Sequence, residues 1–295
     1  MMTPILSIII VTYNHSNEII ECLEAIDKNY SVHPLEIFVV DNSSKDSTIS
    51  VIEHFIQSKQ NQNRTINLIQ NVVNVGFTQA VNQGLNQATG KFLLLLNPDT
   101  KVEEKAVDSM MQFLSNHPGV GAVAPQLLFS DGSIQPSCRR FPRYRFVAYE
   151  LLGLSYFFPN NKIFNGWKMG DFDHNAIRVV QQPQGSCLMI PGEVIREVGE
   201  LDERFFLFFS DVDLCKRIWR NDHKIYFYPH AKVTHQKGSS IYRARAKLTW
   251  QSHLDFIRYF LKWYRLPWLW ILNIFGVPFL LVLGGLRWMF YRLND

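Results

Sequence analysis

The chain contains few cysteines, and they are widely scattered. None of Cys22, Cys138, Cys187 and Cys215 belongs to a CxxC pair. Zinc sites need closely spaced cysteines, and disulfide-stapled small domains need many of them. The sequence therefore argues against both, and cysteines in this arrangement are typical of a reducing compartment.

Glycine-rich phosphate-binding motifs are also missing. The first apolar run continues into VTYNHSN (11–17), which has no glycine where a dinucleotide-binding fold would place GxGxxG. No GxxxxGKS or GxxxxGKT sequence occurs. These absences exclude a nicotinamide-dependent dehydrogenase and a P-loop enzyme.

Acidic residues are scarce near the C-terminus. Residues 237–295 hold nine Lys and Arg against only Asp255 and Asp295, a net charge of +7, so the first 236 residues carry −3 of the total +4. Residues 266–286 are 21 positions without a charge, about the length that spans ~30 Å of hydrocarbon. Lys and Arg on both sides suit anionic headgroups. We expect a helix that spans a membrane or lies in its interface, with a buried helix pair as the alternative.

Apolar runs alternate with helical patterns over the first 125 residues. The runs predict strands at 7–11, 36–40, 66–70, 91–96 and 120–124. Apolar residues at helical spacing predict a helix in each interval between them. This order indicates a doubly wound α/β sheet. Ligands of such sheets bind beyond the carboxyl ends of the strands, here at residues 12–14, 41–43 and 97–99.

Five segments together resemble glycosyltransferase family 2, in particular its rhamnosyltransferase-like branch. They are SIIIVTYN (7–14), VVDNSSKDST (39–48), NVGFTQAVNQG (74–84), LLLLNPDT (93–100) and the region 185–240. The resemblance implies a GT-A fold, which is a Rossmann-like mixed sheet flanked by helices. We predict a catalytic domain over 1–236, with a nucleotide-binding half (1–125) and an acceptor half (126–236). The C-terminal segment 237–295 would be helical and membrane-associated.

The resemblance places nucleotide recognition behind the first two strands. Asp41 would bind the base or ribose of the donor, beside Thr12, Tyr13 and Asn14. The alternative is that Asp41, Ser44 or Asp46 merely caps the helix that begins near Thr48. Further donor contacts implied by the resemblance are Asn74, Gly76, Phe77, Asn82, Asn97 and Gly185.

Asp99 matches the last carboxylate of the family's DxD-type motif. In that role it would hold Mg²⁺ or Mn²⁺, and a hard cation stabilises a departing nucleoside diphosphate. Asn97 stands where related enzymes have an acid, which leaves one charge fewer. The alternative is a turn followed by a capping box between Thr100 and Glu103, with Asp99 just ahead of a helix.

His235 matches the second metal ligand in the family's closing pattern. A histidine in a basic loop is alternatively a solvated residue or a phosphate contact. Four neighbours would meet the diphosphate or an acceptor phosphate: Lys237, Ser239, Ser240 and Arg243.

Asp211 follows the aromatic run in FFLFFSDVDLC (205–215) and matches the general base of an inverting transfer. The alternative is helix capping, because Ser210 and Asp213 have the spacing of a capping box and acids stabilise a first helical turn. We assign that structural role to Asp213 and the chemistry to Asp211. Ser210 replaces the glutamate that usually precedes this aspartate.

These features predict an inverting, metal-dependent transferase. It would move rhamnose or a similar hexose from a nucleoside diphosphate-sugar to a glycan or polyprenyl-diphosphate-linked acceptor, at the cytoplasmic face of the membrane. The basic, aromatic stretch 139–173 would form an acceptor-side flap, and we expect no nucleic-acid partner. A degenerate family member that binds without turnover is the alternative. A processive synthase is disfavoured, because QxxRW and several spanning helices are missing.

Overall fold

The computed structural model describes residues 4–30, 34–59, 64–236 and 245–294. Its first part alternates strand and helix as predicted, and the five expected strands are all present. The elements are β1 (Leu6–Thr12), α1 (Ser16–Asn29), β2 (Leu35–Asp41), α2 (Thr48–Ser58), β3 (Arg64–Gln70), α3 (Phe77–Leu85), β4 (Phe92–Leu96), β5 (Thr100–Val102), α4 (Ala106–Asn116) and β6 (Val120–Leu128).

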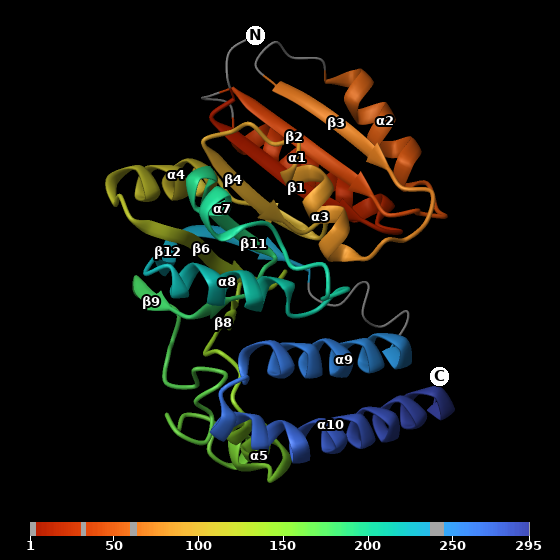
Figure 1. Cartoon of the computed structure of the whole chain (residues 1–295). Helices are drawn as coiled ribbons and strands as arrows, with labels where there is room; N and C mark the ends of the chain where they lie inside the picture. The colour runs from red at the N-terminus through yellow and green to blue at the C-terminus, as the bar shows by residue number, and fades with distance from the viewer. Residues whose placement is uncertain (1–3, 31–33, 60–63, 237–244, 295) are drawn as a thin grey trace.

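The second part has shorter strands and ends in two long helices (Figure 1). Its elements are β7 (Ile134–Gln135), β8 (Cys138–Arg139), α5 (Tyr144–Leu151), α6 (Leu154–Phe157), β9 (Arg178–Val180), β10 (Gln182–Pro183), β11 (Cys187–Pro191), α7 (Gly192–Val198), α8 (Ser210–Arg220), β12 (Lys224–His235), α9 (Arg245–Trp263) and α10 (Pro267–Asn294).

One mixed sheet takes in most of the strands from β1 to β12. Among the described residues it has ten strands, in the order β3-β2-β1-β4-β11-β6-β12-β5, with β7 on β6 and β9 on β12. The strands β3, β2, β1 and β4 run parallel, and their register sets Thr12 opposite Asp41. The carboxyl ends of these strands therefore meet along one edge, where the sequence predicts the site.

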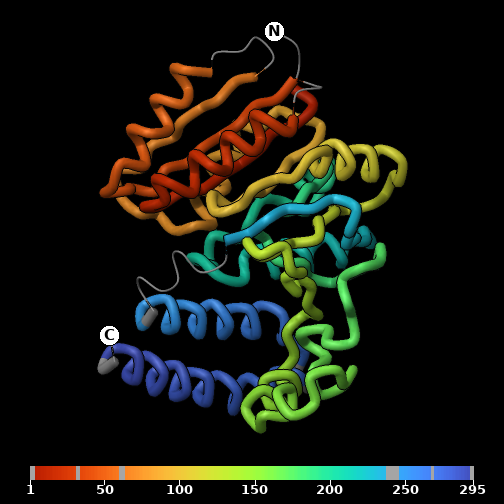
Figure 2. The backbone as a smooth tube through the Cα atoms, turned by 180° about the vertical axis from the view of Figure 1, so that it is seen from behind, coloured from red at the N-terminus to blue at the C-terminus, as the bar shows by residue number. Residues whose placement is uncertain are grey.

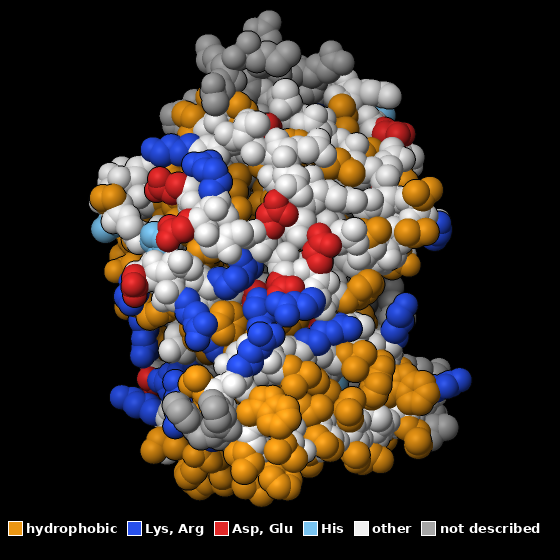
Figure 3. Space-filling view, viewed as in Figure 1, with side chains coloured by type: hydrophobic (Ala, Val, Ile, Leu, Met, Phe, Trp, Pro, Cys, Tyr) orange, Lys and Arg blue, Asp and Glu red, His pale blue; other side chains and the backbone are white. Residues whose placement is uncertain are grey.

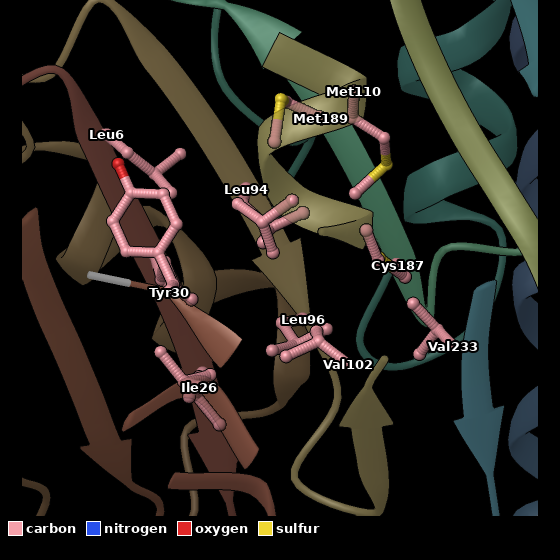
Figure 4. Close-up of a cluster of buried hydrophobic side chains, with 14 of the residues drawn as sticks. Leu6, Ile26, Tyr30, Leu94, Leu96, Val102, Met110, Cys187, Met189 and Val233 are labelled. Carbon is pink, nitrogen blue, oxygen red and sulfur yellow. The ribbon is translucent and has the colours of Figure 1, made fainter. Parts of the chain in front are cut away.

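The sheet is buried on both faces by alternating side chains. On β1, Ile8 and Ile10 enter one core cluster, and Ile9 enters the cluster on the other face. Successive residues of a strand point to opposite faces, so one apolar run supplies two cores. Figure 4 shows part of the first cluster, where Leu94 and Leu96 of β4 lie among side chains from α1, α4, β11 and β12.

The helices α9 and α10 form an antiparallel hairpin at the end of the molecule opposite β3 (Figures 1 and 2). Within α10, residues Leu269–Arg292 are long and apolar enough to cross a membrane, with a mean hydropathy of 2.1 and 17% of the most apolar window buried. The side chains of Leu280 and Asn273 are buried, and Gly284 lies against His253 of α9. Because most of α10 is exposed, the alternative of a buried helix pair does not describe it.

Candidate active site

Asp41 ends β2 with an unused acceptor. Its carboxyl group is buried, and Oδ2 accepts the Ser44 N–H at 2.9 Å. Its Oδ1 has no hydrogen-bond partner among the described residues. At the start of α2 the Thr48 N–H donates to Asp46 Oδ1 at 3.0 Å, and not to Asp41. The carboxylate of Asp41 is therefore left for another donor, which a nucleoside offers in its ribose hydroxyls and base N–H groups.

The β1 end lies beside Asp41. The Thr12 hydroxyl is buried and lacks a partner within the described chain, while Tyr13 is exposed at the edge. Asn14 adopts a left-handed backbone (φ 56°), and its Oδ1 accepts the Lys45 N–H at 2.7 Å. Thr12, Asn14 and Asp41 thus converge, as the sequence predicts for a nucleoside site.

Asn74 shapes the loop before α3. Its Oδ1 accepts the Asn42 side-chain amide and the Gly76 N–H, both at 3.0 Å. Gly76 has φ 91°, and a Cβ there would lie 2.7 Å from the Phe206 ring. The Phe77 N–H donates to the Phe206 carbonyl at 2.9 Å. The predicted donor loop is therefore packed against the aromatic run that leads to Asp211.

Asn82 lies farther along α3 and is used internally. Its side-chain amide donates to the Leu201 carbonyl at 2.9 Å and to Glu203 at 3.1 Å, and its Oδ1 accepts the Leu201 N–H at 3.0 Å. The side chain is also buried. Asn82 thus fixes the 201–203 loop, which differs from the pocket-lining role that the resemblance implies.

Asp99 and His235 meet through strand pairing. β5 runs antiparallel to β12 with Thr100 opposite His235, and the ring Nε2 lies 3.4 Å from Asp99 Oδ1. The alternative of a capping box is wrong, because Thr100 lies in a strand and α4 begins only at Ala106. Its two side chains are used elsewhere: the Thr100 hydroxyl donates to the Asn97 carbonyl at 2.7 Å, and Glu103 accepts the Thr234 hydroxyl at 2.9 Å.

This pair has the chemistry of a small cation site. His235 Nδ1 lies 2.8 Å from Gln135 Oε1, and a Gln135 oxygen there fixes the proton on Nδ1 and leaves the Nε2 lone pair facing Asp99. Asp99 Oδ1 accepts no hydrogen bond from the described residues. The residues that the structure describes hold no cluster of three or more His, Cys, Asp or Glu side chains that could bind a metal ion. Mg²⁺ commonly takes one or two protein ligands together with substrate phosphates and water, so Asp99 and His235 fit such an ion.

Asp211 lies in the first turn of α8, after Phe209 in a left-handed conformation (φ 65°). Its Oδ2 accepts the Gly185 N–H at 3.0 Å. A Cβ on Gly185 would lie 2.8 Å from the Asp211 Cβ, so this approach requires glycine. Burial raises the pKa of the Asp211 carboxyl, against the opposing effects of hydrogen bonds from Val212 and Gly185 and of the Arg139 charge. A higher pKa makes this carboxylate a stronger base.

The two halves of the site are joined by the residues just before β11. The Asn97 N–H donates to the Ser186 carbonyl at 2.9 Å, and Ser186 follows Gly185. The segment 185–186 therefore connects the Asp99 side to Asp211.

Arg139 is a neighbour that the sequence indicates only as part of the basic flap 139–173. It is set in place by the pairing of β8 with β10, and its charge acts on Asp211.

Asp213 has a structural role, but not the expected one. Its buried carboxylate accepts Arg217 Nε and Trp263 Nε1, both at 2.9 Å, and pairs with Lys262 Nζ at 2.6 Å. The Ser210 hydroxyl is buried and has no partner in the part of the chain that the structure covers. The capping box between Ser210 and Asp213 is therefore wrong, because Asp213 instead ties α8 to α9.

Asp255 is not among the predicted site residues, yet its carboxylate, on α9, contacts the aromatic run before Asp211. The signal was an acid, one of only two in the otherwise basic and apolar segment 237–295. Four predicted phosphate contacts lie outside the described residues: Lys237, Ser239, Ser240 and Arg243.

The fold is that of the GT-A transferases. The mannosyltransferase PcManGT from Pyrobaculum calidifontis, solved with GDP-Man and Mn²⁺, matches 97% of this chain and 74% of its own at 17% identity and a TM-score of 0.61. Staphylococcus aureus TarS 1-349 matches 83% of this chain and 64% of its own at 15% identity, with a TM-score of 0.55.

The chain belongs to glycosyl transferase family 2, because the model of that family matches residues 7–177. N-acetylglucosaminyl-diphospho-decaprenol L-rhamnosyltransferase of Mycobacterium tuberculosis is 26% identical over 288 residues, covering 92% of this chain and 90% of the relative. The low-salt glycan biosynthesis hexosyltransferase Agl10 of Haloferax volcanii is 24% identical, covering 87% and 74%. The family and the fold together define a glycosyltransferase.

Proposed function

We propose that this glycosyltransferase is inverting and metal-dependent, and that it moves rhamnose or a similar hexose from a nucleoside diphosphate-sugar to a glycan or polyprenyl-diphosphate-linked acceptor. The observation that carries the proposal is the convergence of Asp211, Gly185 and Asn97, with the Asp99–His235 pair, at one edge of the sheet. The likeness to the mycobacterial rhamnosyltransferase supports the choice of sugar and acceptor.

Asp211 acts as the general base in this proposal. It takes the proton of the acceptor hydroxyl while that oxygen bonds to the anomeric carbon, and the bond from this carbon to the diphosphate oxygen breaks with its electron pair. Attack opposite the leaving group inverts the configuration. The raised pKa of Asp211 favours proton transfer, and the Gly185 N–H holds Oδ2 in place.

The donor side divides into two parts. Asp41, Thr12, Tyr13 and Asn14 hold the nucleoside, and Asp99 and His235 hold the divalent cation. When bound, Mg²⁺ or Mn²⁺ neutralises charge on the departing nucleoside diphosphate.

Membrane association supplies a lipid-linked acceptor in this proposal. Figure 3 shows an apolar lower surface over α10 with a band of Lys and Arg above it. The apolar face of α10 consists of exposed residues three or four positions apart: Ile271, Phe275, Phe279, Val282, Leu286 and Phe290. Leu152, after α5, and Tyr156 and Phe157 of α6 are also exposed. α5 contacts α10 through the Tyr144 hydroxyl, which donates to Asn273 Oδ1 at 2.7 Å. We place this surface in the cytoplasmic face of a membrane, where basic residues meet anionic headgroups.

Thermal unfolding tests the donor site. The protein is melted with UDP, dTDP, GDP or CMP, each with Mn²⁺ and then with EDTA, because a ligand of the native state raises the melting temperature. We expect a metal-dependent rise with one nucleoside diphosphate. Asp99→Asn should lose it, and Glu104→Gln, a change of an exposed acid nearby, should keep it. No rise with any nucleotide would contradict the proposal.

The same protein separates turnover from mere binding. Asp211→Asn should keep the nucleotide-dependent rise in melting temperature and lower transfer, measured as acceptor-dependent release of nucleoside diphosphate, by about 10²-fold or more. Asn97 and Ser210, which replace acids of the family pattern, favour the alternative of a degenerate binder. In that case the wild type would show the rise without release, and Asp211→Asn would change no rate.

A further inference from the structure

One buried carboxylate of α9 receives the backbone of the segment that precedes Asp211. The N–H groups of Phe206, Leu207 and Phe208 lie 3.4, 3.3 and 3.0 Å from the Asp255 carboxylate oxygens. Consecutive N–H groups that converge on one anion form a nest, and an ionised acceptor strengthens each hydrogen bond. The segment 206–208 is thus held by another part of the chain and not by its own secondary structure.

Asp255 is equipped for this contact. Its side chain is fully buried, and Arg258 Nη1 and Gln251 Nε2 also donate to Oδ1 at 2.6 and 2.9 Å. A buried carboxylate is tolerated only where partners replace its hydration, and here part of that replacement comes from the segment 206–208.

Both ends of this segment reach the site. At one end, Phe206 contacts Gly76 and accepts the Phe77 N–H, so it sets the donor loop. At the other end, Phe209 turns the chain into α8, where Asp211 lies. Lys262 and Trp263 of α9 also hold Asp213, two residues beyond Asp211. The helix α9 therefore grips the chain on both sides of the candidate base.

We propose that Asp255 is a positioning residue for Asp211. The C-terminal hairpin of α9 and α10 would then hold the active site in place as well as face the membrane. This inference rests on the proposed function. A hairpin detached from the catalytic region would leave Asp211 unaligned, so acceptor transfer would depend on the seating of α9.

The test uses the full chain and two readouts. Asp255→Asn keeps the shape of the side chain and removes its charge. We expect amide hydrogen exchange at residues 206–208 to become at least tenfold faster, and kcat to fall at least tenfold with a smaller change in the donor KM. Asp255→Glu restores the charge one methylene away and should recover part of both. If Asp255→Asn does not fold, the same readouts apply to Asp255→Glu.

Asp27→Asn is the control for loss of a paired carboxylate. Asp27 lies in α1 and pairs with Lys59 at 2.9 Å and with Arg64 of β3, so this change leaves the contacts of α9 in place. Its exchange at 206–208 and its kcat should match the wild type. Faster exchange in Asp255→Asn with an unchanged kcat would overturn the positioning role, and unchanged exchange would overturn the contact itself. A wild type without transferase activity would instead refute the proposed function, whatever the exchange shows.

Discussion

At the scale of single residues, Lys216 is a charged side chain that lies among aromatic rings outside the site. Its Nζ lies over the rings of Trp263 (4.7 Å) and Tyr259 (4.9 Å) and bonds the Tyr259 hydroxyl at 3.0 Å. Burial lowers the pKa of Lys216 from 10.5 to about 8, assisted by the charges of Arg220 and Arg143 and opposed by Asp213. The cation–π contacts offset only part of the lost hydration.

This residue predicts a pH dependence of stability. Between pH 8 and 10.5 the unfolded chain binds a proton at Lys216 that the folded chain does not, so this residue makes the free energy of unfolding rise with pH in that window. Lys216→Met should remove a rise on the order of 1–3 kcal/mol. Urea unfolding of both proteins at several pH values from 7.5 to 10.5 measures the difference.

Lys224→Met controls for loss of a cation above a ring. Lys224 lies 4.3 Å from the Trp219 centroid but is exposed. Its difference from the wild type should stay constant across the window. An equally constant difference for Lys216→Met would contradict the assignment.

At the scale of elements, the loop before β11 packs so closely on the first turn of α8 that no Cβ fits at Gly185. A Cβ on Gly185 would lie 2.9 Å from Asp211 Oδ2 and 2.8 Å from its Cβ. We expect Gly185→Ala to displace the carboxylate and lower kcat at least tenfold, because general-base catalysis depends on position. The melting-temperature rise with nucleotide should persist. Steady-state kinetics and thermal unfolding measure the two effects.

Gly285→Ala is the matched change in α10, where an added Cβ meets nothing within 4 Å. It should keep the wild-type kcat. A Gly185→Ala protein with the wild-type kcat would mean that the contact between Gly185 and Asp211 does not contribute to catalysis.

Elements whose signal is local were predictable from the sequence. The strands β1, β2 and β4 are buried along their whole length and therefore appear as largely apolar runs. The polar residues at their ends are those that line the predicted site. The resemblance also named Asp99 and His235 together, and the structure places these side chains next to each other although they lie far apart in the sequence.

The two capping boxes that the spacing suggested, one as an alternative and one as the role of Asp213, fail for one physical reason. Thr100 with Glu103, and Ser210 with Asp213, have the spacing of capping boxes, but each pair is drawn into contacts with a distant element. β12 captures Thr100 and Glu103, and α9 captures Asp213. Residue spacing predicts only hydrogen bonds between neighbours in the sequence. It could not predict tertiary contacts of this kind, including the nest of N–H groups that binds Asp255.

At the scale of the whole molecule, the apolar face of α10 predicts binding to anionic vesicles. Phe275, Val282 and Leu286 are 74%, 63% and 61% exposed, and burying a large apolar side chain contributes about 1.5–3 kcal/mol when complete. Replacing all three with serine should weaken binding at least tenfold. Flotation with phosphatidylglycerol-containing vesicles, compared with purely zwitterionic ones, measures both the apolar and the charge contributions.

Ile177→Ser with Val179→Ser is the control, since these residues are exposed apolar side chains near β9. This variant should bind like the wild type. If the α10 variant binds vesicles as tightly as the wild type, α10 does not contact the membrane. If the wild type binds both vesicle types equally, the basic band does not contribute to binding.

The pairing of β5 with β12 also has a consequence for folding during synthesis. A ribosome delivers the N-terminal half first, and that half contains Asp41 and Asp99 but not His235. The parallel strands can pair early, yet Asp99 and His235, the proposed metal ligands, come together only when β12 emerges and docks beside β5. Binding of a metal-bound donor as proposed would therefore require that this sheet has finished folding.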